Sequence, residues 1–192
     1  MSVNRRSFLS AMAFLPFWRA PNPPLVVSLA RFHPVHNHPL NGLEIRLGAI
    51  QASHLPQILS IRPFASLGEA TAARNAGAET QLLMGTMRAF PPLGGLLELR
   101  SWRAPDPLQL EVQHQRLAAL LPRYGLSPVL SASTIGGGDL QEFVYLIPFQ
   151  QLAARASAWS ALAADQEWIE LRQQCRTSVS RIALYRSTSQ QY

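Results

Sequence analysis

The chain has 192 residues, of which 47% are hydrophobic and only 15% are charged. This length suits one large domain or two small ones, and the low share of charged residues excludes a disordered charged tail and a long solvated coiled coil. The formal net charge of +6 comes from seventeen arginines, because the sequence contains no lysine. The arginines are scattered, so the sequence does not predict a nucleic-acid-binding surface.

The first 24 residues have the order of an export signal. Arg5 and Arg6 precede Phe8 and Leu9, a pattern that resembles the twin-arginine signal of bacteria. The apolar stretch 8–18 has the length of a signal peptide core and is too short to span a membrane. The segment predicts a periplasmic or secreted protein without an integral membrane span, with a cytoplasmic location as the alternative.

Two copies of one unit follow the linker at 20–24. Residues 61–67 resemble residues 146–152, since both read as a strand that ends in Pro-Phe and leads into a helix. Upstream, Gly42-Leu43 corresponds to Gly125-Leu126. These two pairs are separated by nearly the same number of residues as 61–67 and 146–152. The expected order in each copy is strand, connection, strand, strand, helix, strand.

The second copy shows every element of this order. Asp106-Pro107 predicts a helix start, and the left-handed turn that favours glycine is expected at Gly125. Strands are expected over 126–133 and 140–147, joined by a glycine-rich hairpin. Asp165 is expected to begin a further helix. The expected helix faces carry Leu110, His114, Leu117 and Leu121 on the first helix, Leu152, Ala156, Trp159 and Ala163 on the next, and Trp168, Leu171 and Cys175 on the last.

The first copy is degenerate, because 34–41 contains two prolines where the second copy has a helix, and a loop is expected there. A βαββαβ unit is ferredoxin-like and leaves one sheet face to be buried. The fold class predicted is α+β, with two tandem units that bury these faces against each other in an α/β barrel. The expected parts are a signal and linker (1–24), a degenerate unit (25–90), a linker (91–95) and a second unit (96–192). We expect a monomeric pseudo-dimer or a weak homodimer.

Three short motifs of the second copy resemble the NIPSNAP family. They are the strand 97–102 (Leu-Glu-Leu-Arg-Ser-Trp), the helix end 123–125 (Arg-Tyr-Gly), and 164–168 (Ala-Asp-Gln-Glu-Trp), where Gln166 replaces the usual proline. The resemblance covers about residues 96–186 and implies the fold of the dimeric α/β-barrel group. It implies no catalytic residues, because this family has none agreed.

Alternating polar residues on the expected strands suggest a polar barrel interior. If Leu97 and Leu99 face the helices, their alternating neighbours face inward. The candidate ligand-binding residues of this interior are Glu98, Arg100, Trp102, Arg62, Arg46, Tyr145 and His114. Arginines there suit an anionic ligand, but a structural ion-pair network is the favoured interpretation, because buried charges must be paired.

Other residues that could carry chemistry have simpler structural explanations. His114 lies on a leucine face and is expected to be a core histidine, while Cys175 is expected to be an inert buried side chain. His33, His36 and His38 are weak evidence for a metal, so no metal or other cofactor is predicted. No nucleophile, phosphate-loop or dinucleotide motif occurs, so no catalytic residue is assigned.

The leading functional hypothesis is a NIPSNAP-like protein that binds a small molecule or a protein partner and is not an enzyme. The alternative is a cofactor-free monooxygenase or isomerase of the α/β-barrel group, in which His114, Tyr145 or Arg100 would act on the substrate. A haem protein ranks last, since no histidine occupies an obvious proximal position. An open cavity with convergent polar groups would favour the enzyme, and a filled, ion-paired interior would favour a binding or structural role.

Overall fold

The computed structural model describes residues 25–32, 45–51, 58–73, 79–88, 95–137 and 140–187. The export-like segment lies outside the described residues, as do the loop expected at 34–41 and the histidines at 33, 36 and 38.

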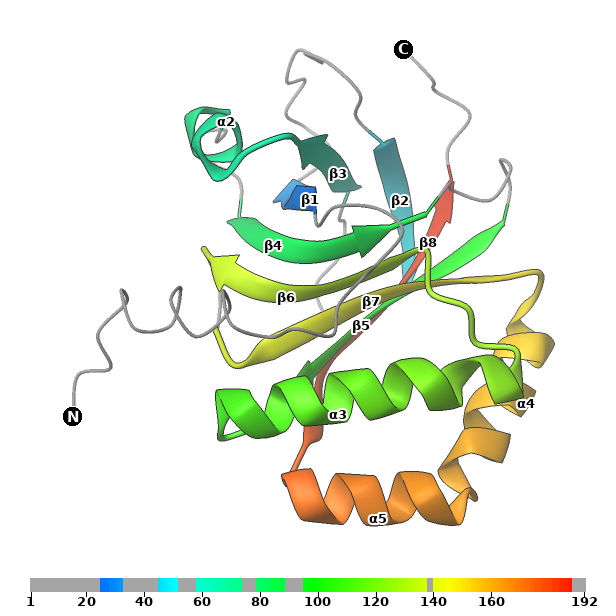
Figure 1. Ribbon diagram of the computed structural model, residues 1–192. Coiled ribbons are helices and arrows are strands. Elements are labelled where there is room, and N and C mark those ends of the chain that lie inside the picture. Colours follow the sequence, from blue (N-terminus) through cyan, green and yellow to red (C-terminus); the bar gives the residue numbers. More distant parts are fainter. Residues whose placement is uncertain are drawn as a thin grey trace.

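Eight antiparallel strands form a closed barrel within the single chain (Figure 1). Their order around the barrel is β1-β3-β2-β8-β5-β7-β6-β4, and β4 pairs back with β1. The strands are β1 (Leu25–Phe32), β2 (Ile45–Gln51), β3 (Ile58–Phe64), β4 (Glu79–Met87), β5 (Leu96–Arg103), β6 (Leu130–Gly136), β7 (Glu142–Phe149) and β8 (Ser178–Ser187). Every strand therefore has two hydrogen-bonded neighbours.

The strands of the N-terminal half, β1–β4, and of the C-terminal half, β5–β8, follow the same order around the barrel. In each half this order is fourth, first, third, second. Two seams join the halves: β2 pairs with β8, and β4 pairs with β6, where Gly85 lies opposite Ala132. A Cβ atom on Gly85 would lie 2.1 Å from the Ser131 carbonyl oxygen, so this seam needs a glycine.

Within the described ranges, helices cover the two halves unequally (Figure 1). The short α2 (Leu67–Ala72) contacts β1 and β3 on one side of the barrel. On the other side lie α3 (Pro107–Leu120), the 3-10 turn η1 (Leu121–Tyr124), α4 (Leu152–Ala163) and α5 (Gln166–Cys175). These three α-helices form a layer outside the C-terminal half.

The predicted helix boundaries of the C-terminal half are confirmed. The Asp106 side chain accepts from the Leu108 amide at 2.9 Å, and Asp165 accepts from the Trp168 amide at 2.9 Å. Gly125 has φ 71° and ends η1. The strand expected from residue 126 begins only at Leu130, because the Leu126 amide still donates to the Leu121 carbonyl in the helix end.

The described core has two main layers. One layer lies inside the barrel and consists of side chains of both halves, namely Val27, Leu59, Ile61, Leu83, Leu97, Leu99, Val129, Leu130, Ala132, Val144, Leu146, Ala183 and Tyr185. Beside it, the buried Gln81 Nε2 donates to Thr134 Oγ1 at 2.6 Å and to Glu142 Oε2 at 3.2 Å. The other layer lies between the sheet and α3–α5 and includes Trp102, Phe143, Tyr145, Ile147 and Trp168. Strands β5 and β7 are therefore buried on both faces.

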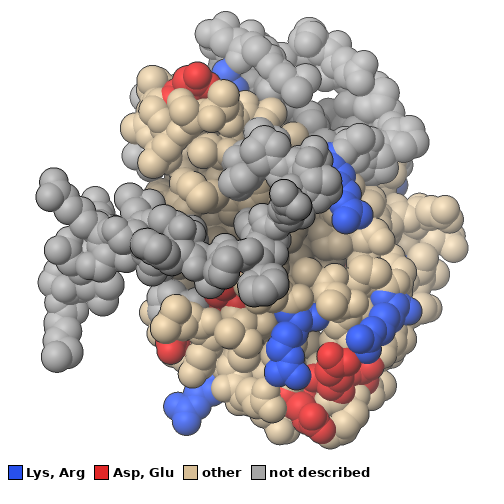
Figure 2. Space-filling model, viewed as in Figure 1, with Lys and Arg blue, Asp and Glu red and all other residues tan. Residues whose placement is uncertain are grey.

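Among the described residues, no helix is long and apolar enough to cross a membrane. On the face shown in Figure 2, charged side chains of both signs gather over the helices at the bottom. An exposed ion pair between Arg123 and Glu167 joins η1 to α5 at 2.8 Å.

Candidate functional site

The structure corrects the faces assigned to β5. Leu97 and Leu99 point into the barrel, and Glu98, Arg100 and Trp102 point toward the helices, the reverse of the expectation. A period of two shows which residues share a face of a strand, but both faces of this strand are buried, so alternation alone cannot say which face meets the helices. The candidate site therefore lies outside the barrel, in the layer under α3 and α4.

Glu98 is the centre of an ion cluster, which we define as Glu98, Arg100, Arg155 and Trp159. The Arg100 Nε donates to Glu98 Oε1 at 2.5 Å, and the Arg155 Nε donates to Oε2 at 2.5 Å. The Trp159 indole Nε1 donates to the same Oε2 at 2.9 Å. The Glu98 side chain has no exposed surface, so these three donors replace the water that a carboxylate needs.

Arg100 is held more tightly than a surface arginine. Its guanidinium carbon lies 3.5 Å from the centre of the Trp159 ring and 5.6 Å from that of Trp102. Burial lowers the pKa of Arg100, and the nearby Arg155 charge adds to this effect, whereas Glu98 opposes it. The cluster thus joins β5 to α4 through one carboxylate and two cations.

Three tryptophans continue the layer from the ion cluster to α5. Trp102 packs edge-on against Trp168 with ring centres 5.0 Å apart, and its ring centre lies 6.5 Å from that of Trp159. Trp168 is buried, as predicted. Residues 98, 100 and 102 therefore dock α4 and α5 onto the sheet.

His114 and Tyr145 lie in the adjoining layer under α3, in the helix–sheet core rather than inside the barrel. The His114 Nε2 is 3.0 Å from Ser131 Oγ, and its ring centre is 3.6 Å from that of Phe143. Burial lowers the pKa of His114 to about 3 and raises the pKa of Tyr145 well above its ordinary value. Both side chains are therefore neutral near pH 7.

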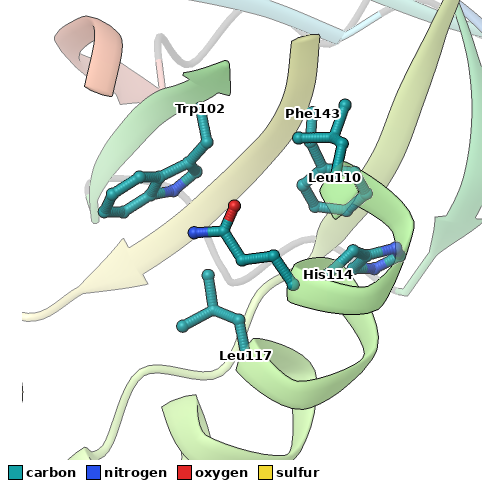
Figure 3. Close-up of a pocket in the computed structure, with 6 residues that line it drawn as sticks. Trp102, Leu110, His114, Leu117 and Phe143 are labelled. Atoms are coloured by element: carbon teal, nitrogen blue, oxygen red, sulfur yellow. The ribbon is translucent and has the colours of Figure 1, made fainter. Parts of the chain in front are cut away.

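The α3 crevice, lined by Trp102, Leu110, Gln113, His114, Leu117 and Phe143, is filled by its own side chains. Figure 3 shows Leu110, His114 and Leu117 of α3 directed toward Trp102 of β5 and Phe143 of β7. The crevice leaves no room for a water molecule. Gln113 donates from Nε2 to Thr177 Oγ1 at 2.7 Å, so this amide ties α3 to the start of β8.

Of the two candidates in the N-terminal half, the structure describes the side chain of Arg62, which is not brought to the ion cluster. The guanidinium carbon of Arg62 lies 5.6 Å from the centre of the Phe64 ring, on the side of β3 that α2 contacts. The side chain of its neighbour Ile61 points into the barrel. The backbone of Arg46 pairs with Ser60 in β2–β3, and its side chain lies outside the described part of the structure. The six predicted pocket residues whose side chains the structure describes therefore do not form one site.

The remaining family-like motifs also dock helices. The Tyr124 hydroxyl donates to Asp165, the residue that caps α5, and this bond lowers the pKa of Asp165. Cys175 is free and buried, as expected, and burial raises its pKa. Within the described ranges no group of acidic, histidine or cysteine side chains could hold a metal ion.

Sequence reasoning did not assign Arg155 to the site. The signal was present: Arg155 lies four residues before Trp159 and thus on the same side of α4. Gln113 and Ser131 carried no comparable signal, because single polar residues on a helix or strand are common.

Residues 97–188 match the family model of NIPSNAP, and no curated protein matches the chain. The match spans β5 to the end of β8, with α3, α4 and α5 between them. It confirms the resemblance drawn from the motifs at 97–102, 123–125 and 164–168, all of which the structure places at contacts between the helices or between the helices and the sheet. The segment of this chain that is similar to a NIPSNAP domain is therefore residues 97–188.

Proposed function

We propose that this protein binds a small molecule or a protein partner without transforming it, and that the binding surface lies outside the barrel, on the helix-covered side of β5–β8. The observation that carries this proposal is the apolar cluster that both halves contribute to the barrel interior. The polar candidates that could recognise a ligand gather instead beneath α3 and α4.

The protonation states of the buried candidates favour binding over the cofactor-free monooxygenase or isomerase. With a pKa of about 3, His114 is a weak base near neutral pH. The raised pKa of Tyr145 makes it a poor proton donor there. Glu98 accepts hydrogen bonds from Arg100, Arg155 and Trp159, so both of its carboxylate oxygens are already engaged in the ion cluster.

The two halves are interpreted as tandem ferredoxin-like units, the first one degenerate, that pair in the manner of a dimer. The identical strand order of the two halves supports this interpretation. Because the seams lie within one chain, the working state would be a monomer or a weak homodimer.

We further propose that the protein acts in the periplasm or outside the cell. The support is the order of Arg5-Arg6, the apolar stretch 8–18 and the proline-rich linker. Replacing both arginines by lysine should prevent translocation, because the receptor reads the guanidinium pair. A double variant that still reaches the periplasm would contradict the export proposal, and a cytoplasmic native protein would support the alternative location.

Native mass spectrometry of the full chain, purified from the periplasmic fraction, tests the binding proposal. We expect a mass excess that survives gentle desolvation and disappears when the protein is denatured in acid. Incubation of the released compound with fresh protein should return it unchanged. A chemically altered compound would overturn the proposal and support the enzyme.

A further inference from the structure

We propose that Arg100 and Arg155 form a binding site for a small oxyanion, that is, a carboxylate or phosphate group. This inference rests on the proposed binding function and names its ligand class. The two arginines face one carboxylate, so the ion cluster has an excess of one positive charge. Among the residues that the structure describes, Glu98 is the carboxylate that pairs with either arginine.

The donors required for an oxyanion are present. A guanidinium carries five N–H donors, and Glu98 takes the Nε donor of each arginine. The terminal nitrogens of both guanidinium groups therefore keep their capacity to donate. Paired guanidinium nitrogens match the spacing of two oxygens in a carboxylate or phosphate, which a single ammonium group does not.

The site is held in place before a ligand arrives. Arg100 is fixed between Glu98 and the face of Trp159, and only 10% of its side chain is exposed. Because Arg100 and Arg155 are already ordered by Glu98, an anion would lose less conformational entropy on binding than it would at two free surface arginines. The aromatic ring also lowers the local dielectric constant, which strengthens charge-assisted hydrogen bonds.

Arg155 gives the site its access to solvent. Its side chain is 22% exposed, whereas Glu98 has no exposed surface. On the sheet side, Arg100 lies opposite Ile182 of β8, an apolar residue that is itself exposed. An anion approaching from solvent would meet Arg155 first, because the Glu98 carboxylate has no exposed surface.

The repulsion between the two arginines supplies a driving force. The Arg155 charge contributes to the lowered pKa of Arg100, so the two cations destabilise each other. A bound anion between the terminal nitrogens would relieve this repulsion. Binding should therefore weaken as ionic strength rises, although less than at a fully exposed pair.

The test is calorimetric titration of the full chain with sodium phosphate and, separately, with sodium acetate, each against sodium chloride at equal ionic strength. We expect saturable binding of at least one oxyanion. Arg155→Gln should weaken it at least tenfold, and Arg155→Lys, which keeps the charge, should weaken it less. The matched control is Arg172→Gln, which should leave the affinity unchanged. It removes an exposed arginine whose guanidinium carbon lies 5.7 Å from the centre of the Trp168 ring.

Phosphate binding without acetate binding would identify a phosphate group, and the reverse a carboxylate. Heat signals equal to those of chloride in the native chain would overturn the oxyanion site. Equal affinity in a folded Arg155→Gln and the native chain would overturn it as well. Such a failure leaves the broader binding function testable, because native mass spectrometry would still detect a ligand of another class.

Discussion

The N-terminal and C-terminal halves of the barrel share one strand order but differ in their helical cover. The described part of the N-terminal half has only α2, with six residues, against the sheet. The C-terminal half has α3, α4 and α5, fixed by the ion cluster, three tryptophans and the bond from Tyr124 to Asp165. The family-like motifs of the C-terminal half lie at contacts of its helices, whereas the barrel interior is formed by an apolar cluster to which both halves contribute.

The two halves should depend on each other, and separating them should have the largest effect. Residues 96–192 expressed alone would expose the barrel-facing side of β5–β8, including Leu97, Leu99 and Leu146. We expect this fragment to dimerise or aggregate in size-exclusion chromatography with light scattering. Residues 25–192 should elute as a monomer, or as a dimer that dissociates on dilution without unfolding. A soluble, well-folded monomer of 96–192 would mean that the halves are independent domains.

The helix layer should be the most sensitive part of the C-terminal half. Trp168→Ala removes the ring that packs against Trp102, and we expect it to lower the free energy of unfolding by about 3–5 kcal/mol. Trp168→Phe keeps an aromatic ring and should cost clearly less. Urea unfolding measures both variants, and a loss below about 1 kcal/mol for the alanine variant would show that the layer contributes little.

The seam between the halves can be tested at one glycine. Gly85→Ala places a Cβ 2.1 Å from the Ser131 carbonyl oxygen and 2.5 Å from the Ala132 Cα, so β4 and β6 must move apart. We expect a loss of about 3 kcal/mol. In Gly136→Ala, also on this seam, the nearest atom to the new Cβ is the Leu82 Cδ1 at 3.9 Å, and stability should change by less than about 0.5 kcal/mol. Equal effects of the two substitutions would argue against close packing at Gly85.

The helix layer should also give the C-terminal half a pH dependence. The pKa of His114 is about 3 in the folded protein and near 6.5 when unfolded, so below pH 6.5 the unfolded chain binds a proton that the folded protein excludes. The stability due to neutral His114 is complete above pH 6.5 and is lost as the pH falls toward 3. When the pH is lowered from 7 to 5, the free energy of unfolding of His114→Gln, measured by urea titration, should fall by about 2 kcal/mol less than that of the native chain. Parallel curves for the two proteins would contradict the burial of a neutral His114.

The smallest expected effect concerns the connection from α5 to β8. Arg176 ends α5 with φ 49°, a left-handed conformation that glycine adopts without strain. We expect Arg176→Gly to raise the free energy of unfolding by about 0.5–1 kcal/mol, measured by thermal unfolding. Arg172→Gly, inside the helix, is the control and should lower it by a similar amount. Destabilisation by Arg176→Gly would show that the arginine side chain makes a stabilising contact.

Much of the fold could be predicted because it depends on local signals. Asp106, Asp165 and Gly125 mark helix ends through their own backbone chemistry, and the motifs at 97–102 and 164–168 identified the family segment. The orientation of β5 could not be predicted, because Leu97 and Glu98 are equally buried and only their distant partners distinguish the two faces. Those partners, Leu59 on one side and Arg155 on the other, are set by tertiary packing.

Barrel closure also governs how the chain must fold. In the β2–β8 seam, Leu47 lies opposite Ser187, so residues that are far apart in the sequence must meet before the hydrogen bonds of this seam can form. Contacts between such distant residues slow folding, because loop entropy is lost before the contacts compensate it. Until that seam closes, β2 and β8 each carry an unpaired edge that another strand could occupy. The slow step of folding is thus also the period in which the chain is most exposed to aggregation.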